Sequence, residues 1–112
     1  MTAFRIPYLE IVQRQDPGGF LRLTLLGALD LSTIGRLKAY LRQLKYESER
    51  VRLDLSRLEF LASIGVSVLA GAVIEARREG WQLEVFDQLS RPVRKTVNLV
   101  GISACFWPEG HA

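Results

Sequence analysis

The sequence predicts an α/β domain of two layers, in which helices pack mainly on one face of a mixed, mostly parallel sheet. Two observations indicate this fold class. Short segments of alternating apolar and polar residues are interleaved with longer segments of helical spacing, in the order β-β-α-β-α-β-α. Helical crossovers join parallel strands, and the alternation leaves one face of the strands polar, so we expect a partly solvated sheet face.

The first half of the chain predicts a hairpin followed by a helix. Residues 8–13 alternate imperfectly and residues 20–26 alternate cleanly, and the Asp-Pro-Gly-Gly between them is a strong turn signal. We expect Gly27 to end the second strand and Ser32 or Thr33 to cap the helix. The apolar stripe of that helix consists of Ile34, Leu37, Leu41 and Leu44.

The second half of the chain predicts two further strands and two further helices. Residues 51–55 alternate and predict the third strand. A helix is expected from about Ser63 to Glu79, a strand over 81–86 and a helix near 91–100, with a glycine directly after each helix. The middle helix carries small residues that would let it lie close to the sheet: Ala70, Gly71, Ala72 and Ala76.

Length and composition favour one cytoplasmic domain spanning 1–112, with its core over about 8–106. Cys105 is the only cysteine, so no internal disulfide forms, and we interpret it as a small apolar filler. The start of the chain lacks a signal-peptide pattern, and no apolar stretch is long enough to span a bilayer. The net charge of +3 is scattered among acids, unlike a nucleic-acid footprint.

No catalytic pattern is present in the sequence. His111 is the only histidine, and it has no acid–base or nucleophilic partner nearby in the chain. No Cys/His cluster has metal-ligand spacing. We therefore expect no enzyme activity, no catalytic residue, no metal and no cofactor. Trp107 either packs back onto the domain or presents an apolar contact to a partner.

Three stretches, taken together in order and spacing, resemble the STAS domain, the family named after sulfate transporters and anti-sigma-factor antagonists. The most specific is 54–66, where Asp-Leu-Ser precedes Phe-Leu-Ala-Ser-Ile-Gly-Val; the family has Asp-Ser-Ser/Thr-Gly-Leu/Val at its end. Residues 27–33 are similar to the family's Gly-Glu-Leu/Ile-Asp, and 90–101 are similar to its final helix. The resemblance implies the STAS-like two-layer fold, and the length matches stand-alone bacterial antagonists.

The resemblance implies a partner switch as the function. In the family, the unphosphorylated antagonist binds an anti-sigma factor that is also a serine kinase; phosphorylation breaks the complex and a phosphatase restores it. Carried onto this sequence, the phosphate acceptor is Ser63, at the start of the middle helix. The implied partner-binding residues are Asp30, Ser63, Ile64, Gly65 and Ser67.

The residues themselves leave alternatives open at this site. Ser63 is either a phosphate acceptor, favoured by the positive end of the helix dipole, or simply the helix N-cap. Asp30 either bonds to the Ser63 segment or is a turn residue before the first helix. Gly65 is expected to permit a close approach at the helix start, and Ser67, one turn later, is a poorer second acceptor.

Three departures from the family pattern support a second hypothesis. Ala62 stands where the family has an Asp, Ile64 where it has a second hydroxyl, and Ala28 where it has a Glu. The chain would then be a non-phosphorylated accessory subunit, like the STAS proteins that sit on bacterial lipid-transport ABC ATPases. A third reading, a small-molecule or nucleotide sensor, rests on family analogy alone.

Overall fold

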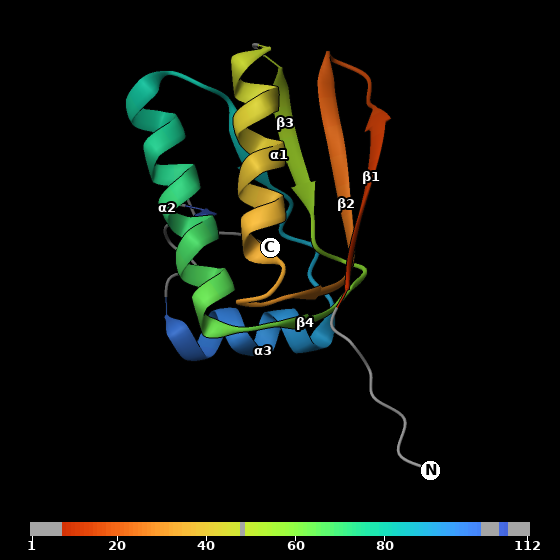
Figure 1. The fold of residues 1–112 in the computed structure, drawn as a ribbon, viewed down its shortest axis with the longest axis vertical. Coiled ribbons are helices and arrows are strands. Elements are labelled where there is room, and N and C mark those ends of the chain that lie inside the picture. Colours follow the sequence, from red (N-terminus) through yellow and green to blue (C-terminus); the bar gives the residue numbers. More distant parts are fainter. Residues whose placement is uncertain (1–7, 48, 102–105, 108–112) are drawn as a thin grey trace.

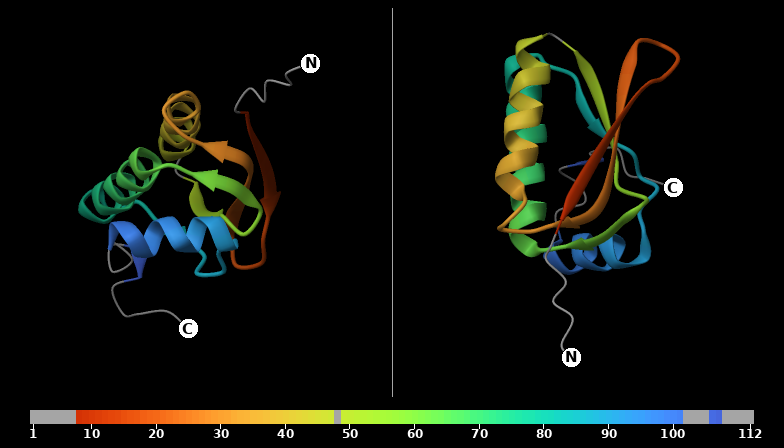
Figure 2. Two further views of the ribbon diagram at one scale, coloured as in Figure 1. Left: turned by 90° about the horizontal axis from the view of Figure 1, so that it is seen from below. Right: turned by 45° about the vertical axis from the view of Figure 1, so that its right-hand side comes forward.

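The structure is a computed structural model, and it describes residues 8–47, 49–101 and 106–107. Within these ranges a five-stranded sheet is accompanied by three helices. The helices α1 and α2 lie side by side on one face of the sheet, and α3 lies across its lower end beside β4 (Figures 1 and 2). The two-layer α/β architecture that the sequence predicts is therefore confirmed. The elements are β1 (Leu9–Gln15), β2 (Phe20–Leu29), α1 (Ile34–Tyr46), β3 (Arg50–Asp54), β4 (Leu58–Leu61), α2 (Ser63–Glu79), β5 (Leu83–Val85) and α3 (Arg91–Val100).

The long strand β2 is the centre of the sheet. It pairs with β1 in antiparallel register along one edge. On its other edge it pairs in parallel first with β3 and then, over its last residues, with β4. The order is β1-β2-β3-β5, with β4 joined to β2. The sheet is thus mixed and mostly parallel, as the helical crossovers predict.

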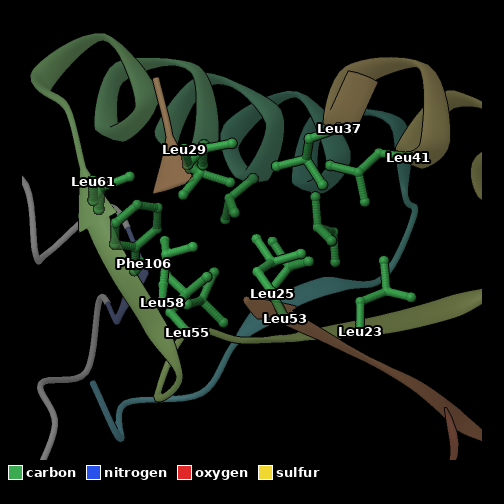
Figure 3. Packing of buried hydrophobic residues seen from close by; sticks show 14 of the residues in the cluster. Leu23, Leu25, Leu29, Leu37, Leu41, Leu53, Leu55, Leu58, Leu61 and Phe106 are labelled. Carbon is green, nitrogen blue, oxygen red and sulfur yellow. The ribbon is translucent and has the colours of Figure 1, made fainter. Parts of the chain in front are cut away.

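Alternate residues of the strands form the core beneath α1 and α2. Leu23, Leu25 and Leu53 are fully buried. Figure 3 shows these three side chains facing Leu37 and Leu41 of α1. The predicted apolar stripe of α1 is buried along its whole length, so its packing follows from the helical spacing alone.

The opposite face of the sheet is a layer of arginines and aromatic rings. Arg22 and Arg52 are direct neighbours in the β2–β3 register, which is unfavourable for like charges. The repulsion is offset because Arg22 pairs with Asp16 at 2.8 Å and Asp54 at 3.3 Å, and the guanidinium of Arg52 lies 3.7 Å from the ring centre of Phe20. The hydrogen bond from Arg22 holds the pKa of Asp16 below its ordinary value. These pairs explain why polar residues alternate with the buried apolar residues in β2 and β3.

The structure departs from the strand predictions at three points. Gly27 does not end β2; it adopts a φ of 97°, and the strand continues to Leu29 with a register shift against β4. The strand β4 itself was not predicted, because its Leu-Glu-Phe-Leu sequence is short and does not alternate. The predicted strand over 81–86 is shorter, spanning Leu83–Val85.

The predictions for the helices need one correction. Gly80 and Gly101 end α2 and α3 in the left-handed conformation, as expected. Ala70 and Ala76 of α2 are buried, but Gly71 faces outward and does not help α2 to approach the sheet.

The structure describes only some of the residues near the chain end for which predictions were made. The indole nitrogen of Trp107 donates a hydrogen bond to the Val85 carbonyl at 2.8 Å, so Trp107 packs back onto the domain. Cys105 and His111 lie outside the described residues.

We expect Gly27→Ala to destabilise the domain by at least about 2 kcal/mol, because φ is positive and a Cβ atom there would lie 2.3 Å from the Tyr8 carbonyl oxygen. Gly18→Ala is the matched control, since Gly18 has a similar φ of 88° but no atom within 4 Å of the added Cβ. It should lose only about 1 kcal/mol. Urea unfolding measures both losses, and equal losses would contradict the close contact.

Candidate functional site

The candidate site is the start of α2, which is held directly against the end of β2. The backbone N–H of Ala62 donates to the carbonyl of Leu29 at 3.0 Å. Gly65 lies in the first turn, where a Cβ atom would be 3.0 Å from that same carbonyl oxygen and 2.9 Å from Cδ1 of Leu61. The prediction that Gly65 permits a close approach is confirmed. Since Gly65 is buried, it positions the helix and is not itself a contact surface.

Ser63 is the first residue of α2 and is exposed. The N-cap is Ala62, which is extended and has no side-chain oxygen, so the N-cap alternative for Ser63 is wrong. Across the described residues, the Ser63 hydroxyl has no hydrogen-bond partner. The structure thus removes the commonest structural role for a serine at a helix start and leaves its oxygen open to solvent.

The first turn of α2 favours an anion electrostatically. The first hydrogen bond of the helix runs from the Val66 N–H to the Ala62 carbonyl at 3.1 Å. The N–H groups of Ser63, Ile64 and Gly65 therefore have no acceptor in the part of the chain that the structure describes. This turn, which is described in full, carries no acidic residue. A phosphate on Ser63 would meet the positive end of the helix dipole.

Asp30 belongs to the turn between β2 and α1. Its Oδ1 accepts hydrogen bonds from the Ser32 N–H at 2.9 Å and the Ser32 hydroxyl at 2.6 Å. These bonds, led by that of the Ser32 hydroxyl, lower the pKa of Asp30 from its ordinary value. Among the described residues Asp30 has no hydrogen bond to the Ser63 segment. The turn-residue alternative for Asp30 is therefore confirmed.

Thr33 fixes the same turn in a way the sequence did not reveal. Its hydroxyl donates to the Ala28 carbonyl at 2.8 Å and accepts from the Asp30 N–H at 3.0 Å. Thr33 is the N-cap residue of α1, yet its side chain makes no cap hydrogen bond. Its exposed fraction is only 7%. The hydroxyl ties the turn to the end of β2 instead, which no spacing rule predicts.

Large apolar side chains are exposed around Ser63. Leu31 is 78% exposed, Phe60 52% and Ile64 44%. Of these, only Ile64 was named by the sequence analysis. Leu31 could have been found, because a leucine between two polar turn residues has no strand or helix face to explain it.

The β2–β4 register brings these residues to one end of the molecule. Leu29 pairs with Leu61, so the residues that follow β2 lie beside those that begin α2. Asp30, Ser63 and Ser67 therefore share one end of the domain, with Ser67 exposed one turn along α2. We call the group Leu31, Phe60, Ser63 and Ile64 the Ser63 surface.

Comparison with known proteins identifies the fold family. A family model described as Mlab, STAS domain, matches residues 12–106. The chain belongs to the STAS domain family. The crystal structure of an anti-sigma factor antagonist from Mycobacterium paratuberculosis has the same fold, with a TM-score of 0.72 and 24% sequence identity over 88% of this chain and 83% of that chain. No curated protein matches the sequence.

The described part of this STAS domain lacks membrane-spanning helices and metal-binding clusters. None of the described helices is long and apolar enough to cross a membrane. Residues 8–47, 49–101 and 106–107 contain no group of three or more His, Cys, Asp or Glu side chains that could hold a metal ion.

The bonds to Asp30 predict a pH-dependent contribution to stability. A carboxyl whose pKa is lowered by folding stabilises the folded state above its unfolded pKa, and this contribution is lost as the pH falls through the folded pKa. The difference in urea midpoint between wild type and Asp30→Asn should therefore be constant from neutral pH to about pH 5. It should shrink as the pH falls below the ordinary value of 3.8.

Ser32→Ala is the control for the cause of this effect, since it removes the hydroxyl that lowers the pKa most. In that variant the loss of stability should begin at a higher pH. An NMR titration of the Asp30 carboxyl carbon measures the pKa directly. A value at or above 3.8 in the wild type would contradict the turn geometry.

Proposed function

We propose that this STAS domain acts as an anti-sigma-factor antagonist in the cytoplasm, binding an anti-sigma factor that is also a serine kinase and released by phosphorylation of Ser63. The single observation that carries the proposal is the exposed Ser63 hydroxyl at the start of α2, surrounded by exposed apolar side chains and without a hydrogen-bond partner among the described residues. In this proposal the protein functions by binding and is not an enzyme.

The composition of the Ser63 surface supports binding to another protein. Leu31, Phe60 and Ile64 expose apolar area beside a turn whose polar groups are already paired with one another. Protein interfaces are most apolar at their centre and depleted there in charged residues. The Ser63 surface has this character, because none of its four members is charged.

The electrostatics of the helix start support a switch. The free N–H groups of the first turn would tolerate a phosphate on Ser63, so the domain would stay folded. The phosphate adds close to two negative charges, however, at the centre of an apolar contact. A partner that buries Leu31 and Ile64 would have to desolvate that charge. Phosphorylation would therefore break the complex without unfolding the antagonist.

A second candidate function is the non-phosphorylated accessory subunit of a lipid-transport ABC complex. Ile64 is 44% exposed where the antagonists have a hydroxyl, so it extends the apolar area beside Ser63. Ala62 likewise removes an acid next to the serine. A constitutive contact would use these apolar groups without any need for a phosphate. The partner that copurifies distinguishes the two functions.

We expect the tagged protein, purified from its native cells, to carry phosphate on Ser63 and to copurify with an ATPase-domain serine kinase. Mass spectrometry of the partners and of the Ser63 peptide tests both points. The purified kinase should phosphorylate the wild type and Ser67→Ala but not Ser63→Ala. Ser63→Asp should weaken kinase binding at least about tenfold, or about 1.4 kcal/mol.

Gln43→Asp is the control for the added charge, because Gln43 is exposed on α1 and lies outside the Ser63 surface. It should bind like the wild type. Copurification of transporter subunits with an unmodified Ser63, and with Ser63→Asp binding them normally, would reject the switch and support the accessory subunit.

A further inference from the structure

A groove of about 380 Å³ lies between α1 and α2, beginning beyond the first turn of α2 and so apart from the Ser63 surface. Its apolar lining includes the half-buried Val68 and Ala72 of α2 and the edges of Leu37 and Leu41 of α1, which are otherwise buried against the sheet. The two helices that form its walls run side by side (Figure 1). The groove therefore lies on the helical face of the domain and has both apolar and charged residues in its lining.

Gly71 lines this groove, and no contact within the described domain requires a glycine at this position. It is in the middle of α2 and exposed, and a Cβ atom added to it would meet nothing within 4 Å. An exposed glycine inside a helix is less favourable than alanine. Gly27 and Gly65 are each required by a neighbouring backbone, but Gly71 is not. Gly35 of α1 has the same open surroundings outside the groove, so Gly71 does not by itself indicate a partner; it leaves room for a close approach to α2 at this point of the groove.

The α1 wall of the groove is positively charged. Lys38, Arg42 and Lys45 are spaced by four and three residues, so they form one row along the helix. Lys45 pairs with Glu79 of α2. Lys38 and Arg42 have no acidic partner among the residues that the structure describes. Two unneutralised cations therefore stand one helical turn apart beside the apolar lining.

The α2 wall carries the opposite charge. Glu75 lines the groove and has no cationic partner within the described part of the chain. An acidic ligand in the groove would therefore bind with its carboxylates facing α1 and not α2. This asymmetry gives the groove a preferred orientation for its occupant.

We infer that this groove binds an acidic amphipathic helix of a partner protein. Apolar residues of that helix, recurring every three or four positions, would lie against the half-buried Val68 and Ala72. Carboxylates four residues apart would pair with Lys38 and Arg42, because the spacing of the two rows is the same. Gly71 would allow the two helices to approach closely. The inference does not depend on phosphorylation of Ser63.

Site-specific photocrosslinking in the native cells tests this inference. A benzophenone amino acid replaces Glu75 at the groove, and in the control it replaces Gln43, which is exposed on α1 but does not line the groove. We expect Glu75 to crosslink to one protein segment with an apolar face and carboxylates four residues apart. The yield should exceed that from Gln43 at least about tenfold. Combining Lys38→Glu with Arg42→Glu should abolish this excess.

Gly71→Leu supplies a variant that fills the groove without harming the fold. Its melting temperature should equal or exceed that of the wild type, since leucine is a better helix former, yet the crosslink should fall at least about tenfold. Gly35→Leu is the matched control, because Gly35 is also an exposed helical glycine with open space around it but lies outside the groove. It should leave the crosslink unchanged.

Four results with the otherwise wild-type protein would overturn the inference. They are a yield no higher than from Gln43, a crosslink to a lipid or small molecule, a crosslink to a second copy of this chain, and a captured segment without the carboxylate row. A crosslink that survives both Gly71→Leu and the charge reversal would overturn it as well.

Discussion

The contact between the start of α2 and the end of β2 is the constraint on which the candidate site depends. The Leu29 carbonyl accepts the Ala62 N–H, and the absence of a side chain at Gly65 lets the first helical turn close over that carbonyl. β2 reaches this point only because the positive φ at Gly27 carries the strand past a register shift. Backbone interactions thus hold the start of α2, and with it Ser63, against the end of β2. The Ser63 hydroxyl makes no hydrogen bond within the described residues. A side chain that is to be modified must be free in this way.

The helix α2 presents two surfaces of different chemistry. Around its first turn the exposed groups are uncharged, and the backbone N–H groups give a positive potential without any basic side chain. Farther along, the positive potential comes from Lys38 and Arg42 of the neighbouring helix. A charge added at Ser63 changes the first surface strongly, because nothing there screens it except solvent. The second surface begins more than one turn farther along α2 and shares no residue with the first. One helix therefore carries two contact surfaces made of different residues.

Much of the fold was predictable because buried residues recur along the sequence at the regular spacing of a strand or a helix. The alternation of Leu21, Leu23 and Leu25 and the stripe of α1 each fix a face without knowledge of their neighbours. The failures share a different cause. Gly27 and β4 depend on a register between distant strands, and Gly71 looks like any small helix residue until its surroundings are known. At the site, Ser63 was found through the family pattern, but its lack of a cap role follows from how Ala62 meets Leu29. Contacts between residues far apart in the chain produce no regular spacing in the sequence from which they could be predicted.

Two of the residues that the domain's own stability does not explain lie on these two surfaces. Leu31 exposes most of its area to water, and Gly71 weakens an exposed helix by about 1 kcal/mol relative to alanine. Neither belongs to the buried core of the described structure. By contrast, the unfavourable pairing of Arg22 with Arg52 on the open sheet face is fully compensated inside the domain by carboxylates and rings. Features that remain uncompensated in the isolated chain are the ones that contact with another molecule would compensate. Two such features lie at the start of α2 and along the groove beside it, and other exposed apolar side chains, such as Tyr46 and Leu99, lie elsewhere.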